Sequence, residues 1–191
     1  RNGVISYQKA SGLAMFSGIV IFCFYSFIRL KEMLPVEEYG YDAIFFILLI
    51  LCFAWGGDTC AYFAGRAFGK HKLCPVVSPK KTVEGAIGGV LGTMVFGVLV
   101  TVIYSIAADR MEEFTRSNIG VSMYVIIALL ACVAAVLGIY GDLFASVVKR
   151  QCGIKDYGTI FPGHGGILDR FDSVMFIAPF VTMVVIAAFY N

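Results

Sequence analysis

The chain has 191 residues, of which 59% are hydrophobic and 15% charged, against about 45–50% and about 25% in ordinary soluble domains. Its 15 Lys and Arg nearly balance its 13 Asp and Glu, which argues against a nucleic-acid partner recognised through overall charge. With aromatic residues at 15% and only 5 prolines, the composition also excludes a disordered or Pro-rich chain and indicates a lipid environment.

Five apolar stretches approach the length of about 20 residues that a helix needs to cross the roughly 30 Å hydrocarbon core. They cover residues 11–28, 41–57, 83–107, 120–140 and 173–190. The second stretch can continue as a helix toward Phe68 and the fourth toward Arg150, and both continuations carry charged residues. The pattern predicts an all-α fold, a polytopic transmembrane helical bundle with about five spans.

Positively charged residues are distributed unequally between the two faces that five spans would create. One face receives residues 1–10, 58–82 and 141–172 with 11 Lys and Arg, whereas the other holds only Arg29, Lys31, Arg110 and Arg116. Because positive loops stay on the cytoplasmic side, we expect both long, charged loops to lie there. Two loops on one face can build one site.

The third stretch begins with closely spaced glycines, namely Gly85, Gly88, Gly89 and Gly92. Small residues four apart let helices approach closely in lipid, so we expect them to pack against another helix. A phosphate-binding P-loop is excluded because no GK[ST] follows the glycines and no strand is indicated before them.

The first charged loop combines a helical stripe with a cationic segment. Asp58, Tyr62 and Arg66 are spaced by four and would share one face of a continued helix. The cations that follow are Lys70, Lys72, Lys80 and Lys81, and the hydroxyls of Ser78 and Thr82 flank the last two. Hydroxyls beside paired cations suit phosphate oxygens, although solvated lysines of a positive loop are the competing interpretation.

The second charged loop offers carboxylates close to the membrane. Asp142, Ser146 and Lys149 lie on one face of a helix end, and Asp169 and Asp172 are three residues apart before the fifth stretch. Carboxylates near lipid are functional candidates by default, and Mg²⁺ sites often combine few carboxylates with substrate phosphates. The competing interpretation is that acids stabilise a helix N-terminus by about 0.3–1 kcal/mol, which explains one acid better than three.

Long motifs in both loops resemble the phosphatidate cytidylyltransferase family, also called CDP-diacylglycerol synthases. In the second loop the matching residues are Ser146, Lys149, Arg150, Lys155, Asp156, Gly158, Pro162, His164, Gly166, Asp169, Arg170 and Asp172. In the first they are Asp58, Tyr62, Gly65, Arg66, Lys70 and the run from Ser78 to Thr82. The resemblance covers about residues 55–173.

The resemblance implies a nucleotidyltransferase that transfers CMP from CTP to phosphatidic acid, giving CDP-diacylglycerol and pyrophosphate in phospholipid biosynthesis. Its expected cofactor is Mg²⁺, with a second metal ion as a further option, and its expected partners are CTP, phosphatidic acid, the lipid bilayer and a second copy in a homodimer. Residues 1–191 are expected to form a single transmembrane catalytic domain that lacks an N-terminal part of the full protein. We expect it in the bacterial inner membrane, with the site facing the cytoplasm.

The resemblance and the charge pattern together assign roles to individual residues. Metal binding is expected for Asp142, Asp169 and Asp172. Catalytic roles are expected for Asp142, Asp169, Lys149, Arg150, Lys155 and His164. Substrate binding is expected for Ser78, Lys80, Lys81, Ser146, Arg170, Arg66 and Asp58.

Two other classes of function stay open at this stage. A related CTP-dependent lipid enzyme, such as an ether-lipid cytidylyltransferase or a polyprenol kinase, would place acids and bases similarly. A polytopic transporter is less favoured, because transporters carry charges near the bilayer midplane and these charges gather near one surface.

Overall fold

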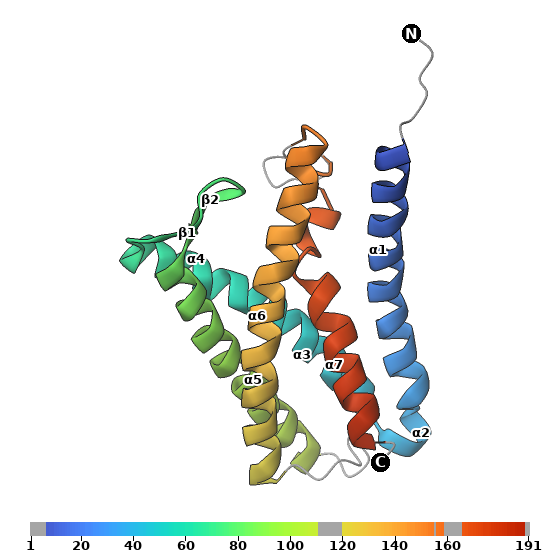
Figure 1. The fold of residues 1–191 in the computed structure, drawn as a ribbon. Helices are drawn as coiled ribbons and strands as arrows, with labels where there is room; N and C mark the ends of the chain where they lie inside the picture. Colours follow the sequence, from blue (N-terminus) through green and yellow to red (C-terminus); the bar gives the residue numbers. More distant parts are fainter. Residues whose placement is uncertain (1–6, 111–119, 155, 159–165, 190–191) are drawn as a thin grey trace.

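The computed structural model describes residues 7–110, 120–154, 156–158 and 166–189. It is a bundle of helices with a small β-hairpin at its edge (Figure 1). The helices are α1 (Tyr7–Met33), α2 (Val36–Tyr39), α3 (Asp42–Leu51), the π-helical turn η1 (Cys52–Gly56), α4 (Gly57–Phe68), α5 (Val83–Arg110), α6 (Val121–Gln151), the 3₁₀ turn η2 (Leu168–Arg170) and α7 (Val174–Phe189). Antiparallel strands β1 (Lys72–Cys74) and β2 (Ser78–Thr82) join α4 to α5.

Within the described ranges, four helical stretches are long and apolar enough to cross a membrane: Ala10–Met33, Asp42–Phe68, Val83–Arg110 and Val121–Gln151. The fifth predicted span is also a helix, α7, but its 16 residues reach only about 24 Å, less than the roughly 30 Å hydrocarbon core. The all-α polytopic bundle is therefore confirmed, as are both predicted helical continuations. The hydropathy pattern does not indicate the hairpin, and the expectation that no strand precedes the glycines of the third stretch is wrong, because β2 ends directly before α5. A P-loop stays excluded because no GK[ST] follows those glycines.

The apolar core lies where α7 packs against α1, α3 and α6. Its large, fully buried side chains include Leu30 of α1, Phe45 and Leu49 of α3, and Ile177 and Val181 of α7. Many large apolar side chains of α5 and α6 point outward instead, as expected for surfaces in contact with lipid. Because α7 is held inside the bundle, the residues just before it are fixed against the other helices.

α4 and α5 approach closely because glycines of α5 face small residues of α4. A Cβ atom at Gly88 would overlap the Cβ of Ala64, and one at Gly92 would overlap Cys60. At Gly85 it would lie 2.8 Å from the backbone oxygen of Ala61. The predicted packing role of these glycines is confirmed, and the hairpin spans the short distance between the two helix ends.

The two charged loops meet at one end of the bundle. The hairpin, the C-terminal end of α6 and η2 lie toward the top of Figure 1, whereas α2 and the C-terminal end of α5 lie at the bottom. One ion pair links the loops directly, between Lys81 of β2 and Asp142 of α6. Just before the first loop, the indole N–H of Trp55 in η1 donates to the backbone oxygen of Arg170 at 3.0 Å. The prediction that both loops share a face is confirmed.

Candidate functional site

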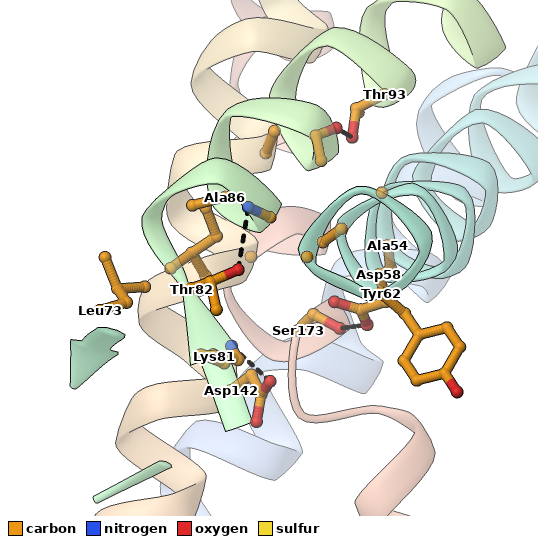
Figure 2. Close-up of a pocket in the computed structure, with 18 of the residues that line it drawn as sticks. Ala54, Asp58, Tyr62, Leu73, Lys81, Thr82, Ala86, Thr93, Asp142 and Ser173 are labelled. Carbon is orange, nitrogen blue, oxygen red and sulfur yellow. Dashed lines mark hydrogen bonds and ion pairs between the residues drawn. The ribbon is translucent and has the colours of Figure 1, made fainter. Parts of the chain in front are cut away.

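A cavity of about 340 Å³ lies between α4, α5 and α6, next to the hairpin (Figure 2). Five of the predicted site residues line it: Asp58, Arg66, Lys80, Lys81 and Asp142. The rest of the wall is largely apolar or small, with Phe53, Ala54, Ala135, Gly138 and Ile177 among its members. The cavity therefore joins a charged region to an apolar one, as a site for an amphipathic substrate requires.

Asp58 lines the cavity directly after a local departure from α-helical geometry. It stands in the first turn of α4, directly after the π-helical turn η1, and such turns within helices occur frequently at functional sites. Its Oδ2 accepts a hydrogen bond from the hydroxyl of Ser173 at 2.9 Å, which joins α4 to the start of α7. Tyr62 and Arg66 follow along α4 and also line the cavity, as the predicted stripe requires.

The hairpin brings a cation to a carboxylate at the cavity. The ammonium of Lys81 lies 2.5 Å from Oδ2 of Asp142, and each side chain is 24% exposed. The hydroxyl of Ser146, one turn further along α6, donates to Oδ1 of Asp142 at 3.3 Å. A phosphate could bind the cation and a metal ion could bind the carboxylate, so this pair carries the two chemistries that the sequence predicts.

A second charged cluster lies beside the first, at the end of α6. The helix ends in a Schellman motif: Gly153 has a φ of 70°, and the N–H of Ile154 donates to the backbone oxygen of Lys149 at 3.0 Å. Lys149 therefore occupies the last turn. Its ammonium lies 3.0 Å from Oδ1 of Asp169 and 3.8 Å from Oδ2 of Asp172.

Asp169 is surrounded by donors from the protein itself. Besides Lys149, its Oδ2 accepts the backbone N–H groups of Tyr157 at 2.9 Å and Gly166 at 2.8 Å. Burial opposes ionisation, but the donors of Gly166, Lys149 and Tyr157 outweigh it and hold the pKa of Asp169 below its usual value. Asp169 is thus an ionised carboxylate that binds the backbone at Tyr157 and Gly166.

Tyr157 completes this second cluster. Its ring lies 5.3 Å below the ammonium of Lys149, a cation–π distance, and its hydroxyl donates to the backbone oxygen of Ala145 at 3.1 Å. Burial, followed by the charge of Asp169, raises the pKa of Tyr157 to about 12, so the hydroxyl stays protonated as a donor. The cluster consists of one cation, two acids and a phenol.

Asp172 is a buried acid with other acids nearby. Burial is the main cause that raises its pKa to about 7, and repulsion from Asp142 and Asp58 adds to it, while Lys149 opposes the rise. The charged form of Asp172 is therefore disfavoured mainly by burial, and the neighbouring acids Asp142 and Asp58 add to this. A cation bound among them would relieve this repulsion.

The donor set fits Mg²⁺ only as a site that substrate completes. Among the described residues, no three His, Cys, Asp or Glu side chains are grouped so as to hold a metal ion by themselves. Mg²⁺ commonly takes one or two carboxylates together with waters and substrate phosphates, and carboxylates are the donor type that Asp142 and Asp169 offer. A shared ion between Asp142 and Asp169 stays a prediction, because Asp142 pairs with Lys81 and Asp169 with Lys149.

Not every predicted site residue lines the cavity. Ser78 begins β2 opposite Cys74, and Arg150 and Arg170 are exposed at the end of α6 and in η2. The predicted residues that lie outside the cavity wall are Ser78, Ser146, Lys149, Arg150, Asp169, Arg170 and Asp172. Lys155 and His164 lie outside the described residues.

Two residues of the site have no assigned role in the sequence interpretation. Ser173 holds Asp58, and Tyr157 holds both Ala145 and Asp169. Each stands beside a residue that the motifs highlight, Asp172 and Asp156 respectively. Proximity to a motif was the only signal, since neither residue type carries a distinctive charge.

Comparison with known proteins agrees with the family resemblance of the two charged loops. A family model described as the cytidylyltransferase family matches residues 4–188. Phosphatidate cytidylyltransferase of Bacillus subtilis (strain 168) is 36% identical over 159 residues, which are 83% of this chain and 52% of that protein. Proteins of the same name from Staphylococcus epidermidis (strain ATCC 35984) and Staphylococcus aureus (strain COL) are 42% and 40% identical over 145 residues, 76% of this chain and 50% of each relative.

The chain spans about half the length of the curated relatives it matches. The family match nevertheless covers nearly all of the chain, including both charged loops and the cavity between them. On this ground, the chain belongs to the cytidylyltransferase family.

Proposed function

We propose that the protein is a phosphatidate cytidylyltransferase, which transfers CMP from CTP to phosphatidic acid and releases pyrophosphate. The observation that carries this proposal is the meeting of Lys81 and Asp142, from the two charged loops, at a cavity in a helical membrane bundle. The names of the relatives support the choice of substrates. The largely apolar wall next to the charged groups suits a lipid that ends in a phosphate.

In the proposed reaction, an oxygen of the lipid phosphate forms a bond to the α-phosphorus of CTP. The bond from that phosphorus to the bridging oxygen breaks, and pyrophosphate leaves with the electron pair. A phosphate monoester has a second pKa near about 6, so it is largely ionised at neutral pH and needs no strong general base. The protein must therefore hold two anions in line and balance their charge.

The residues of the cavity can supply this charge balance. Lys80, Lys81 and Arg66 line the cavity and would contact phosphate oxygens. Asp142 and Asp169 would hold Mg²⁺, with Asp172 as a further partner, and the ion would supply positive charge to the leaving pyrophosphate. Arg150, Arg170, Lys155 and His164 keep their assigned roles as predictions.

We further propose that the charged end of the bundle faces the cytoplasm in the bacterial inner membrane. The excess of Lys and Arg on this side supports the orientation, and CTP would reach the site from water while phosphatidic acid would reach it from the leaflet. The homodimer stays a prediction.

A direct assay tests the proposed activity. The full-length protein in vesicles that contain phosphatidic acid should convert labelled CTP to CDP-diacylglycerol with equal release of pyrophosphate in the presence of Mg²⁺. Asp142→Asn and Asp169→Asn should each lower this rate by more than about a hundredfold. Asp109→Asn, an exposed acid at the other end of α5, should leave it unchanged.

The products separate the alternatives. Release of CDP with a phosphorylated lipid would indicate a kinase, and solute flux without CTP consumption would indicate a transporter. Full activity in Asp142→Asn would remove the metal-binding assignment of that residue.

A further inference from the structure

Glu84, the second residue of α5, gathers donors from the segment that links α4 to β1. Its carboxylate accepts the backbone N–H of Lys70 at 3.1 Å and that of His71 at 3.2 and 3.3 Å. It also lies 2.6 Å from Nδ1 of His71. Next to it, the N–H of Val83 donates to the backbone oxygen of His71 at 3.0 Å, so α5 and this link are joined at several points.

The backbone contacts of Glu84 are the ones that hold the main chain in place. The His71 side chain is 78% exposed, and solvent-exposed pairs contribute little because water and salt screen them. Hydrogen bonds from backbone N–H groups to a carboxylate are charge-assisted, and they fix the main chain itself. The main effect of Glu84 is therefore on where Lys70 and His71 place the start of β1.

The position of β1 determines the position of Lys81. Lys72 of β1 pairs with Thr82 of β2, and Lys81 is the residue before Thr82. On the other side of the hairpin base, the hydroxyl of Thr82 accepts the N–H of Gly85 at 3.1 Å. Both strands are thus tied to the first turn of α5 at the end from which Lys81 reaches Asp142.

We propose that Glu84 is a positioning residue, which fixes the base of the hairpin so that Lys81 is held at the cavity opposite Asp142 and can bind a substrate phosphate. Glu84 is not among the residues that line the cavity, so it acts through Lys81. The inference rests on the proposed function in one respect, namely that the bound group is a phosphate of CTP or of phosphatidic acid.

A double-mutant cycle tests whether Glu84 acts through Lys81. In the full-length protein, Glu84→Ala should raise the KM of the substrate whose phosphate Lys81 binds by about tenfold, with little change in kcat. In a Lys81→Ala background, the same change should have less than about a twofold effect, because its target is gone. Measuring the KM of CTP and of phosphatidic acid separately, each with the other saturating, identifies which phosphate is bound.

Matched variants separate positioning from a general loss of structure. Glu84→Gln keeps an oxygen that can accept the backbone N–H groups and should recover most of the activity. His71→Ala, which leaves the backbone donors in place, should change the KM less than about twofold. Glu37→Ala, an exposed acid on α2 at the opposite end of the bundle, should have no effect.

A readout without substrate distinguishes failure of this inference from failure of the proposed function. Spin labels at Val76→Cys, in the exposed hairpin turn, and Ile154→Cys, after α6, would report their distance by pulsed EPR in a chain whose native cysteines are replaced. Glu84→Ala should broaden the distance distribution, whereas Glu84→Gln should not. This result is expected even if the protein does not consume CTP.

Two results would overturn the inference. One is an unchanged distance distribution in Glu84→Ala. The other is an active protein in which the effects of Glu84→Ala and Lys81→Ala on KM simply multiply, because independent effects would show that Glu84 does not act through Lys81.

Discussion

Lys149 shows at the scale of a single residue how a charge can be kept inside this bundle. It is only 9% exposed, and it faces two acids and an aromatic ring. Removing a buried cation leaves its partners uncompensated, which commonly costs about 3–5 kcal/mol. Lys149 therefore offsets the negative charge of Asp169 and Asp172 at this buried position.

We expect Lys149→Met to lower the free energy of unfolding by about 3 kcal/mol, because the methionine retains volume but removes the positive charge. Equilibrium unfolding by sodium dodecyl sulfate in mixed micelles would measure the change. Arg150→Met is the matched control, since its side chain is exposed, and its effect should stay within about 0.5 kcal/mol. Equal stabilities of the two variants would contradict the structural role of Lys149.

The sequence predicts which helix carries a charged residue better than it predicts the partner of that residue. The spacing along α6 correctly predicts that Asp142, Ser146 and Lys149 are carried by one helix. Spacing says nothing of Asp169, which lies 20 residues beyond Lys149, or of Lys81 on a different element. Such pairs depend on how helices pack, which the local pattern does not contain.

At the scale of elements, the contact between α4 and α5 sets how close the hairpin lies to the cavity. A Cβ atom added at Gly57 of α4, or at Gly85, Gly88 or Gly89 of α5, would come within 3.0 Å of an atom on the facing helix. Because the hairpin connects these two helices, a change in their separation would also move β2. The glycines act on the site only through this packing.

Gly88→Val should destabilise the protein by about 2 kcal/mol, since a side chain at this position overlaps Ala64 and forces the helices apart. Gly18→Val in α1 is the control, because no atom lies within 4 Å of a Cβ placed there. Thermal unfolding of the two purified variants would compare them. A Gly88→Val protein as stable as the control would mean that α4 and α5 can separate at no cost.

The elements differ in how far the sequence determines them. The long helices are predicted by hydropathy. Their charged extensions through Asp58 and Asp142 are predicted because no Pro interrupts the helix there. The hairpin is different, since Lys72 to Thr82 shows no clear alternation of apolar and polar residues. Its ties to Glu84 and Val83 are tertiary contacts, which only the folded chain reveals.

At the scale of the whole molecule, the uneven distribution of Lys and Arg along the chain matches the arrangement of the loops in the folded bundle. The bundle places both charged loops at one end and α2 at the other (Figure 1). The number of spans could predict this shared face, because loops separated by two spans lie on the same side of a membrane, and the count of Lys and Arg predicts which side that is. Neither could predict that the loops would meet across a cavity.

The proposed orientation predicts a labelling pattern in cells. In a chain without native cysteines, Val76→Cys in the hairpin should react with a membrane-impermeant maleimide only after the membrane is made permeable. Glu37→Cys on α2, at the opposite end, should react once the reagent reaches the outer surface of the inner membrane. The reverse pattern would place the charged end outside the cytoplasm.

The π-helical turn η1 has a further consequence for the membrane segment that contains it. Phe45, Leu49 and Ile50 of α3 are buried in the core, while a few residues later Asp58 and Arg66 of α4 line the cavity. An α-helix rotates by about 100° with every residue, so a wider turn changes the direction in which everything beyond it points. The direction in which the polar side chains of α4 point therefore depends on how many residues η1 contains, as well as on which residues these are.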